Sequence, residues 1–399
     1  MILTLDRDND RGVTTKIEQA SSPVIKRLIL NNFRSYPALR IETDARPVVL
    51  TGANGAGKTN LLEAVSMLAP GRGLRGARVR DLDRQDGEPP ASGAWSVAAR
   101  VESSLGIHEI GTGRSTDDGR ERRIVRINGV PVPSQAALGE LVAVLWLTPA
   151  MDRLFQEGSS ERRRFLDRLV LANDPAHVGR VTSYHQALKE RSRLLRSERL
   201  DPAWLDAIET RAASAAIAIA AARRQTVRAL STLLAADPGR FPRPDIRLDG
   251  SVETWLSDLP ALDAEQRLAD AFAANRRRDA ETGTTATGPH RSDLVVHDGK
   301  SGMPAKDCST GQQKALLISI CLAEARRRAG LNQQLPILLL DEVAAHLDAE
   351  RRRDLFDELA TLGTQAWLTG TDASVFQTFG QRAQYFTVNS SELHPYDAN

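Results

Sequence analysis

The chain has 399 residues, of which 41% are hydrophobic and 26% are charged, and its formal net charge is +2. This length suits one large domain or two ordinary ones, and the small net charge means that any nucleic-acid-binding surface must come from local clustering of basic residues. No apolar run approaches the roughly 20 residues of a membrane-spanning helix, and the two cysteines, Cys308 and Cys321, make neither a disulfide framework nor a metal site, which fits a reducing cytoplasm.

The first segment, residues 1–22, is polar and acidic, which predicts a disordered extension or a misassigned start codon and not a secretory signal. Residues 23–150 are rich in strand patterns, separated by turns with Gly and Asp such as GTGRSTDDGR. The predicted strands are VIKRLIL, PVVL, WSVAARV, RIVRI and AVLWL, with ALRIE as a weaker candidate. The one clear helix in this part is TNLLEAVSMLA.

Residues 151–283 have a helical character. SSERRRFLDRLVL has apolar residues at helical spacing, and a long Ala-rich helix is expected to begin at Pro202 with Asp201 as its cap. The residues expected near one face of this long helix are Trp204, Ile208, Ile219, Val227 and Leu230.

Strand patterns return in residues 284–399. DLVVH predicts a strand, a helix is predicted after Ser309, and the strand PILLL and a final strand AWLTG follow. Because strands alternate with helices at both ends of the chain, the pattern predicts one α/β domain interrupted by the helical segment.

The first chemical motif is GANGAGKT, which follows a predicted strand and opens a predicted helix. In this setting, G-x-x-x-x-G-K-[ST] indicates a phosphate-binding loop, whose glycines let backbone amides turn toward phosphate oxygens. The predicted cofactor-binding residues of this loop are Gly52, Ala53, Asn54, Gly55, Ala56, Gly57, Lys58 and Thr59. Lys58 is expected to reach the β- and γ-phosphates, and the Thr59 hydroxyl to bind Mg²⁺. A chance glycine turn is the alternative, and the loop alone does not distinguish ATPases, GTPases and small-molecule kinases.

The second motif is LPILLLDEVAAHLD. Its four apolar residues, 337–340, predict a buried parallel strand that ends in Asp341 and Glu342. Ligands bind beyond the carboxyl ends of such strands, so Asp341 is expected to hold Mg²⁺ through water and Glu342 to orient or deprotonate the attacking water. The pair could instead be the solvated cap of a following helix. Paired acids favour hydrolysis over phosphate transfer to a bulky acceptor.

The third motif is STGQQK, at the start of the predicted helix after Cys308. Ser309 and Gln312 have the spacing of a capping box, so helix initiation alone is one interpretation. The other interpretation is that Gly311 exposes backbone and Ser309 offers a hydroxyl, so that the free N–H groups of the helix start bind a γ-phosphate.

Together the three motifs resemble those of ATP-binding-cassette and SMC-like ATPases, and more closely those of the RecF family. Seven segments follow in the order of that family: LILNNFRSY, GANGAGKTNLLEAV, GRGLR, SSERRRFLDR, GPHRSDL, STGQQKALL and LLLDEVAAHLD. The resemblance implies an α/β fold, with an ABC-type P-loop ATPase domain that has an antiparallel β subdomain and is interrupted by a helical arm domain. The implied boundaries are 23–150 and 284–399 for the ATPase domain and 151–283 for the arm.

This resemblance also implies a function. RecF-like proteins are cytoplasmic, weak ATPases that use ATP and Mg²⁺ and form ATP-dependent head-to-tail homodimers. They bind single-stranded and duplex DNA without strong sequence preference. With other recombination mediator proteins they help to load recombinase at gaps during replication, repair and the SOS response.

Residue roles follow from the same resemblance. Glu342 and Lys58 are the implied catalytic residues, and Thr59 and Asp341 hold the metal. Across the dimer, the residues implied to cap the partner's nucleotide are Ser309, Gly311 and Gln312. The residues implied to contact the nucleotide near its base or α-phosphate are Asn32 and Arg34, and Asp348 is placed at the dimer seam.

Two departures from the family pattern concern the γ-phosphate. No switch histidine follows the strand after the Asp-Glu pair, which reads AWLTGTD, so Thr369 or Thr371 is expected to take that role, in keeping with slow turnover. Gln156 in RLFQEG is a weakly placed candidate for the glutamine that lies near the start of the insertion in these ATPases.

DNA contact is expected to be electrostatic and tolerant of sequence. The arginines of the three candidate clusters are Arg162, Arg163 and Arg164; Arg191, Arg193, Arg196 and Arg199; and Arg276, Arg277 and Arg278. Solvated helix faces are the alternative for any single cluster. His290 in GPHRSDL is expected to be structural, and both cysteines are expected to pack as small apolar residues.

Two rival functions remain open on the sequence. One is an ATPase subunit of a membrane transporter, although such subunits usually have a smaller helical insertion. The other is a non-catalytic DNA-binding scaffold whose nucleotide only stabilises the fold.

Overall fold

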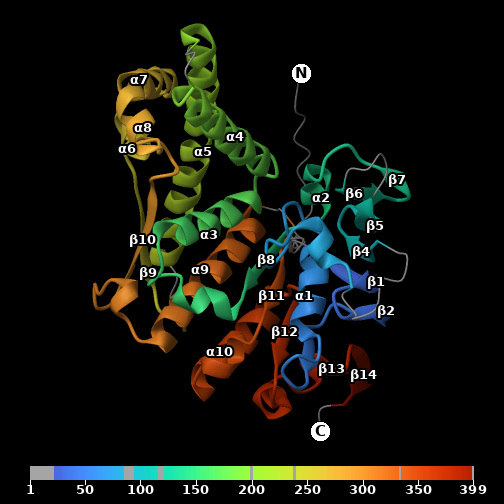
Figure 1. Cartoon of the computed structure of the whole chain (residues 1–399). Coiled ribbons are helices and arrows are strands. Elements are labelled where there is room, and N and C mark those ends of the chain that lie inside the picture. Colours follow the sequence, from blue (N-terminus) through green and yellow to red (C-terminus); the bar gives the residue numbers. More distant parts are fainter. Residues whose placement is uncertain are drawn as a thin grey trace, which may run out of the picture.

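The phosphate loop follows a strand of a mostly parallel sheet (Figure 1). The computed structural model describes residues 22–84, 94–115, 121–197, 201–236, 240–331 and 334–397. Within them the strand order of this sheet is β14-β13-β3-β12-β11-β8. Its strands are β3 (Val48–Thr51), β8 (Val144–Leu147), β11 (Ile337–Leu340), β12 (Ala366–Gly370), β13 (Gln384–Asn389) and β14 (Glu392–Tyr396). All neighbours pair in parallel except β14, which is antiparallel to β13.

The register of this sheet brings the two nucleotide motifs to one edge. Every residue of β3, β8, β11 and β12 is buried, as strands covered on both faces require. Leu340 pairs with both Leu147 and Leu368, and Thr51 pairs with Gly370. The carboxyl ends of β3, β11 and β12 therefore lie side by side, where ligands bind in sheets of this type.

A second, antiparallel sheet covers one side of α1, with the order β2-β1-β4-β5-β6-β7. Its strands are β1 (Val24–Phe33), β2 (Tyr36–Glu42), β4 (Ser96–Ser103), β5 (Gly106–Ser115), β6 (Arg122–Ile127) and β7 (Val130–Pro131). Buried residues alternate with more exposed ones along β4, which is typical of a sheet with one face in the core. Together with the parallel sheet, this confirms the predicted ABC-type ATPase fold with an antiparallel β subdomain.

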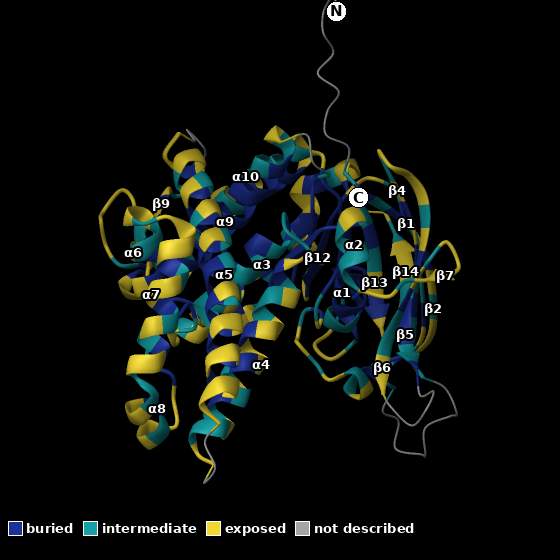
Figure 2. Cartoon of the chain, turned by 90° about the horizontal axis from the view of Figure 1, so that it is seen from above, coloured by how far each residue is buried: buried dark blue, intermediate teal, exposed yellow. Residues whose placement is uncertain are grey.

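Four helices pack with these sheets in what we call the P-loop lobe. They are α1 (Lys58–Ser66), α2 (Ala136–Leu141), α9 (Thr310–Gly330) and α10 (Ala349–Leu362). Short 3₁₀ turns cover Val79–Leu82, Pro149–Arg153, Ala305–Asp307, Val343–His346 and Ala373–Arg382. Every residue of α9 from Gln313 to Ala325 is buried, so α9 is a central helix of the molecule (Figure 2).

The remaining elements form the arm, which projects from the P-loop lobe (Figure 1). They are α3 (Ser159–Leu171), α4 (His177–Leu195), α5 (Pro202–Ala236), β9 (Pro244–Asp249), α6 (Ser251–Asp258), α7 (Ala261–Ala274), α8 (Arg276–Thr282) and β10 (Asp293–Asp298). α5 begins as predicted, because the Asp201 carboxylate accepts hydrogen bonds from the amides of Ala203 and Trp204 at 3.0 and 3.2 Å. Of the residues expected near one face of α5, Ile208, Ile219, Val227 and Leu230 are buried, whereas Trp204 is 50% exposed.

Hydrophobic packing divides the arm into a root and a tip. Residues of α3, the second half of α5 and β9 belong to the same core as the two sheets, among them Phe165, Leu230 and Ile246. A separate, smaller core at the tip joins α4, the first half of α5, α6 and α7, with Ile208 and Phe272 among its members. The arm boundaries at 151 and 283 stay predictions. The arm root shares one hydrophobic core with the P-loop lobe.

Several strands were missed by the sequence analysis. β9 lies inside the segment predicted to be helical and pairs antiparallel with β10, where Leu294 faces Leu248. AWLTG is not the final strand, because β13 and β14 follow it. Residues 111–115 of the predicted turn GTGRSTDDGR belong to β5, and residues 116–120 lie outside the described part of the chain. These strands are short or rich in polar residues, so their pairing partners define them rather than their hydrophobic pattern.

The predicted extension at residues 1–22 lies, apart from Ser22, outside the described residues. Both cysteines are buried and unpaired, as expected. Over the described ranges no helix is long and apolar enough to span a membrane.

Candidate nucleotide site

The phosphate loop has the backbone geometry that its glycines allow. Gly52, Gly55 and Gly57 have φ angles of 150°, 81° and 114°, a region that L side chains rarely adopt. A side chain at Gly57 would also lie 2.9 Å from the Tyr36 hydroxyl, which donates a hydrogen bond to the Gly57 carbonyl at 3.1 Å. Both the close packing and the positive φ angle therefore favour glycine at position 57. Tyr36 of β2 supports the loop, and the sequence analysis did not single it out.

Lys58 is held by its own loop. Its Nζ donates to the carbonyl oxygens of Gly52 and Ala53 at 2.7 and 2.9 Å. Burial lowers the pKa of Lys58, while the nearby carboxylates of Glu342 and Asp341 act in the opposite direction. The ammonium group thus stands at the centre of the loop, where a phosphate oxygen could replace the carbonyl acceptors.

The Thr59 hydroxyl and Asp341, 282 positions apart in the chain, meet at the carboxyl end of β11. Thr59 Oγ1 lies 3.0 Å from both carboxylate oxygens of Asp341. From β12, the Thr369 hydroxyl donates to Asp341 Oδ1 at 2.7 Å and accepts from the Glu342 backbone N–H at 2.9 Å. One buried threonine therefore positions both acidic residues of the second motif.

These oxygens fit a magnesium ion. Mg²⁺ prefers hydroxyl, carboxylate and water oxygens and is held in such sites by one or two protein groups plus the phosphates. Thr59 and Asp341 offer that pair beside the phosphate loop. No group of three or more His, Cys, Asp or Glu side chains suited to a metal ion occurs among the residues that the structure describes.

Glu342 lines a large cleft between the P-loop lobe and the arm root. The cleft has a volume of about 1030 Å³, and Thr59 and Asp341 line it too. Glu342 has a φ of 52°, so the backbone turns sharply after Asp341 and directs the two carboxylates differently. Lys314 of α9, a residue the sequence analysis missed, lies 3.4 Å from the Glu342 carbonyl and 3.3 Å from Asp152. No local pattern could reveal this contact, because it joins residues 28 and 162 positions apart.

The start of α9 contains the capping box that the sequence suggested. The Ser309 hydroxyl accepts from the Gln312 amide at 3.3 Å, and the Gln312 side chain accepts from the Ser309 amide at 2.9 Å. Ser309 is exposed and Gly311 half-buried, and within the described residues no hydrogen bond joins residues 309–312 to the phosphate loop. Helix initiation is therefore real, and the role of this helix start across a dimer stays a prediction.

Arg34 is engaged in polar contacts within the chain. Its guanidinium group forms a bidentate pair with Glu63 of α1, at 2.8 and 2.9 Å, and donates to the Asp81 carbonyl at 2.6 Å. Asn32 and Arg34 both have positive φ angles, 48° and 53°. Their predicted contact with a nucleotide stays a prediction, and the observed contacts make Arg34 a support for α1.

The other candidate residues lie as follows. Thr371 and Gln156 are exposed, and Gln156 does not line the cleft. Asp348 caps α10 by accepting from the Arg351 amide at 2.8 Å, and its place at a dimer seam stays a prediction. His290 is structural, as expected: Tyr184 and the Thr285 carbonyl hold its two ring nitrogens at 2.7 and 2.9 Å, and burial lowers its pKa to about 4.

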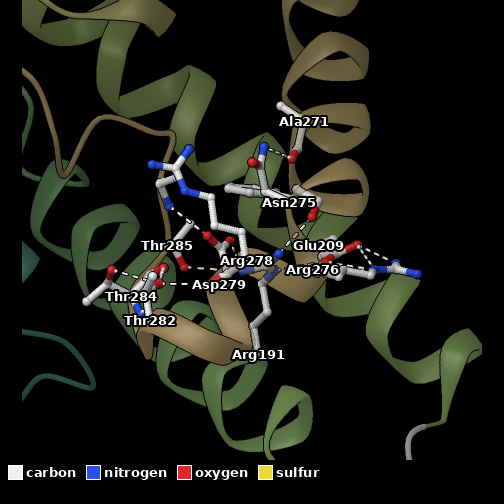
Figure 3. Close-up of polar contacts among 12 residues, drawn as sticks. Arg191, Glu209, Ala271, Asn275, Arg276, Arg278, Asp279, Thr282, Thr284 and Thr285 are labelled. Carbon is white, nitrogen blue, oxygen red and sulfur yellow. Dashed lines mark hydrogen bonds and ion pairs between the residues drawn. The ribbon is translucent and has the colours of Figure 1, made fainter.

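The arginines predicted to face DNA divide into paired and exposed groups. Arg162 forms a bidentate pair with Asp293 at 2.7 and 2.8 Å, and Arg163 donates to the Ser292 carbonyl at 2.7 Å. The prediction of a DNA-facing Arg191 is wrong. Its side chain is 1% exposed and bonds Glu209 and Asp279 at 2.8 and 2.7 Å (Figure 3).

A neighbouring arginine, Arg276, also forms ion pairs within the chain. Arg276 contacts Glu209 through its Nε at 3.1 Å, on the exposed side of the same network (Figure 3). The arginines of the three clusters that remain exposed are Arg164, Arg193, Arg196, Arg277 and Arg278, while Arg199 lies outside the described residues. The sequence could not separate these groups, because their acidic partners come from other elements.

Comparison with known proteins agrees with this geometry. The family model described as the RecF/RecN/SMC N terminal domain matches residues 24–392. The DNA replication and repair protein RecF of Mesorhizobium japonicum is 48% identical over 373 residues, which cover 93% of this chain and 97% of that protein. RecF of Rhizobium rhizogenes is 49% identical over 366 residues, or 91% and 96% of the two chains.

Solved structures show the same fold. A solved structure of the recombination mediator protein RecF of the RecFOR pathway, described as RecF-ATPrS, matches this chain with a TM-score of 0.79 at 21% sequence identity. The match covers 94% of this chain and 99% of that chain. An Smc head domain of Pyrococcus furiosus has a TM-score of 0.52 at 16% identity, with 94% and 96% coverage. The sequence motifs, the arrangement of the phosphate loop beside the Asp-Glu pair and these similarities agree, and the chain belongs to the RecF family.

Proposed function

We propose that this protein is an ATP-binding protein of DNA replication and repair of the RecF type, in which ATP drives a head-to-tail homodimer onto DNA. One observation carries the proposal: Thr59, Asp341, Thr369 and Glu342 converge at the carboxyl ends of β11 and β12, near the Lys58 ammonium group. A phosphate loop alone would serve many nucleotide enzymes, whereas this acidic pair suits hydrolysis.

In the proposed site, Lys58 exchanges the loop carbonyls for phosphate oxygens, and Thr59 and Asp341 hold Mg²⁺. The ion would neutralise phosphate charge when it is bound. Thr369 fixes the Asp341 carboxylate and the Glu342 backbone, and Glu342 orients or accepts a proton from the attacking water. Slow hydrolysis then resets the DNA-bound state, in the manner of a weak, DNA-stimulated ATPase.

The dimer supplies the second half of each nucleotide cage. At the start of α9 the Gly311 N–H has no hydrogen-bond partner among the described residues, and the field of the helix favours an anion such as a γ-phosphate of the partner's nucleotide. Gly311 would make this contact through its N–H, and Ser309 and Gln312 through their side chains, because their own amides are paired in the capping box. The names of the relatives support a place in DNA replication and repair and among recombination mediators. Loading of recombinase at DNA gaps in the cytoplasm is the finer part of this proposal.

Sedimentation velocity of Glu342→Gln with ATP and Mg²⁺ tests this function. Without the carboxylate, we expect hydrolysis to fall and a dimer to persist, while wild-type protein returns to monomer as ATP is consumed. Glu140→Gln, on the exposed side of α2, is the matched control and should behave as wild type. Monomers of Glu342→Gln at saturating ATP would contradict the dimer mechanism, and unchanged phosphate release would contradict the role of Glu342.

A further inference from the structure

A basic hollow lies on the P-loop lobe, between the end of α1, residues 71–82 and β6. Its volume is about 430 Å³, and its lining includes Arg72, Arg78, Arg80 and Arg123 against a single carboxylate, that of Glu121. None of these residues belongs to the nucleotide motifs or to the arm clusters considered for DNA.

One lining residue of the hollow, Arg123, is a half-buried arginine with no acidic partner among the residues that the structure describes. Arg123 donates to the Thr112 hydroxyl at 2.8 Å, to the Gly71 carbonyl at 2.7 Å and to the Gln135 side-chain oxygen at 3.0 Å. It also donates to the carbonyl oxygens of Met67 and Ala69, so every acceptor is neutral. Burial lowers the pKa of Arg123 to about 10, which leaves it charged at neutral pH. A charge that no carboxylate offsets would be stabilised by an anion in the hollow.

The rim of the hollow has unused donors. The side chains of Arg72 and Arg78 are exposed and form no ion pair with any residue in the described ranges. Among the described residues Arg80 forms an ion pair only with its neighbour Asp81, at 3.8 Å, and both side chains are largely exposed, so water screens this pair. Glu121 lies 3.8 Å from Arg114, so its charge is shared with a residue outside the hollow. The rim therefore keeps a positive balance.

We propose that this basic hollow, defined by Arg72, Arg78, Arg80 and Arg123, binds the phosphate groups of a nucleic-acid backbone. The inference rests on the proposed function and places the principal DNA contact on the P-loop lobe rather than on the arm. The exposed guanidinium groups of Arg72, Arg78 and Arg80 can bind phosphate oxygens in a bidentate manner, and such contacts carry no base sequence. Arg123, whose N–H groups donate within the chain, contributes its charge.

In the arm, Arg162, Arg191 and Arg276 are engaged with carboxylates of other elements, and the exposed Arg164 and Arg277 pair with Glu161 and Glu281 on their own helices. Among the described arm arginines of the three clusters, Arg193, Arg196 and Arg278 stay exposed without an ion pair.

The hollow also adjoins the nucleotide site. Gly71 and Arg72 line both the hollow and the cleft that contains Thr59, Asp341 and Glu342. Arg75, in the same segment, lies 3.0 Å from Glu63 of α1, the helix that follows the phosphate loop. A backbone bound in the hollow would restrain this segment, which gives DNA a direct route to the ATP site.

Fluorescence anisotropy with labelled duplex and single-stranded DNA, using the full chain with ATP and a series of salt concentrations, tests the site. We expect Arg72→Gln and Arg78→Gln to weaken binding and to reduce the slope of log K against log salt by about 1 for each arginine that contacts a phosphate. The double variant should show the sum of both effects. Arg277→Gln with Arg278→Gln, exposed on α8 of the arm tip, is the matched control and should keep the wild-type slope.

The outcomes separate this site from the proposed function. If wild type binds DNA and the hollow variants, shown to be folded by their melting curves, keep its affinity and salt slope, the hollow is not the DNA site while the function stands. A loss in the arm control that equals the loss in the hollow variants also overturns the site. If wild type binds no DNA in any nucleotide state, both proposals fail, and binding to phosphatidylserine vesicles in its place would identify a membrane surface as the partner.

Discussion

The Thr369 hydroxyl shows how one side chain can organise a site that spans two strands. It donates to the Asp341 carboxylate and accepts from the Glu342 amide, so the predicted metal-binding and catalytic residues share one anchor. Thr369 is fully buried on β12, whereas Thr371, the other candidate for the missing switch histidine, is exposed. A residue already bonded to both acids can transmit a change at the γ-phosphate to either of them.

Replacing Thr369 with valine should therefore impair the site while keeping the volume of the side chain. The Glu342 N–H would lose its acceptor, which costs about 1–3 kcal/mol in the free energy of unfolding if no water replaces it. We expect ATP turnover, measured by phosphate release, to fall at least about tenfold, which corresponds to about 1.4 kcal/mol in the barrier. Thr371→Val should match wild type in both measurements. A larger loss of turnover in Thr371→Val than in Thr369→Val would reverse the assignment.

Among the helices, α5 and α9 begin in the same way but have different surroundings. Asp201 caps α5 at the arm tip, and Ser309 caps α9 in the P-loop lobe. Local hydrogen bonding explains why each helix begins where it does. Only the start of α9 belongs to a motif that resembles a nucleotide signature, so its cap has a second proposed role.

Ser309→Ala and Asp201→Ala separate helix capping from contact across a dimer. Each substitution removes a cap and should lower the free energy of unfolding by about 1 kcal/mol in urea titrations. Only Ser309→Ala should also weaken ATP-dependent dimerisation, measured by sedimentation. Equal dimerisation of the two variants would leave Ser309 with helix initiation as its whole role.

At the scale of the whole molecule, the described residues form two hydrophobic cores. The larger core joins both sheets, α9 and the arm root, and the smaller core holds the arm tip together. The tip also contains the buried Arg191 network, in which one arginine bonds Glu209, Asp279, Thr285 and the Phe272 carbonyl (Figure 3). This network connects α4, α5, α7 and α8, so it supports the tip independently of the nucleotide site.

Arg191→Leu should destabilise the tip and leave the P-loop lobe intact. Removal of Arg191 leaves the buried Asp279 carboxylate without its cation, at a cost of about 3–5 kcal/mol, while Glu209 keeps its pair with Arg276. Hydrogen exchange should become faster in α4 and α6–α8, with α1 and β11 as protected as in wild type. Arg211→Gln is the control, because Arg211 is 54% exposed and its pair with Glu190 should contribute little. Faster exchange throughout the P-loop lobe would show that the two cores do not unfold separately.

The sequence determined the parts that depend on neighbouring residues. The phosphate loop, the helix that follows it, the apolar strand before Asp341, the caps at Asp201 and Ser309 and the succession of motifs could all be predicted. In each case the interacting groups lie within a few positions of one another, so their spacing alone predicts the structure.

Tertiary structure decided the rest. Thr59 and Asp341 are 282 positions apart, Arg191 and Asp279 are 88 apart, and β9 is defined by its pairing with β10. Whether an arginine faces solvent, as Arg78 does, or is enclosed by carboxylates, as Arg191 is, depends on which elements the folded chain brings beside it. The charge of a residue is written in the sequence, but its partners, and therefore its role, are set by the packing of distant segments.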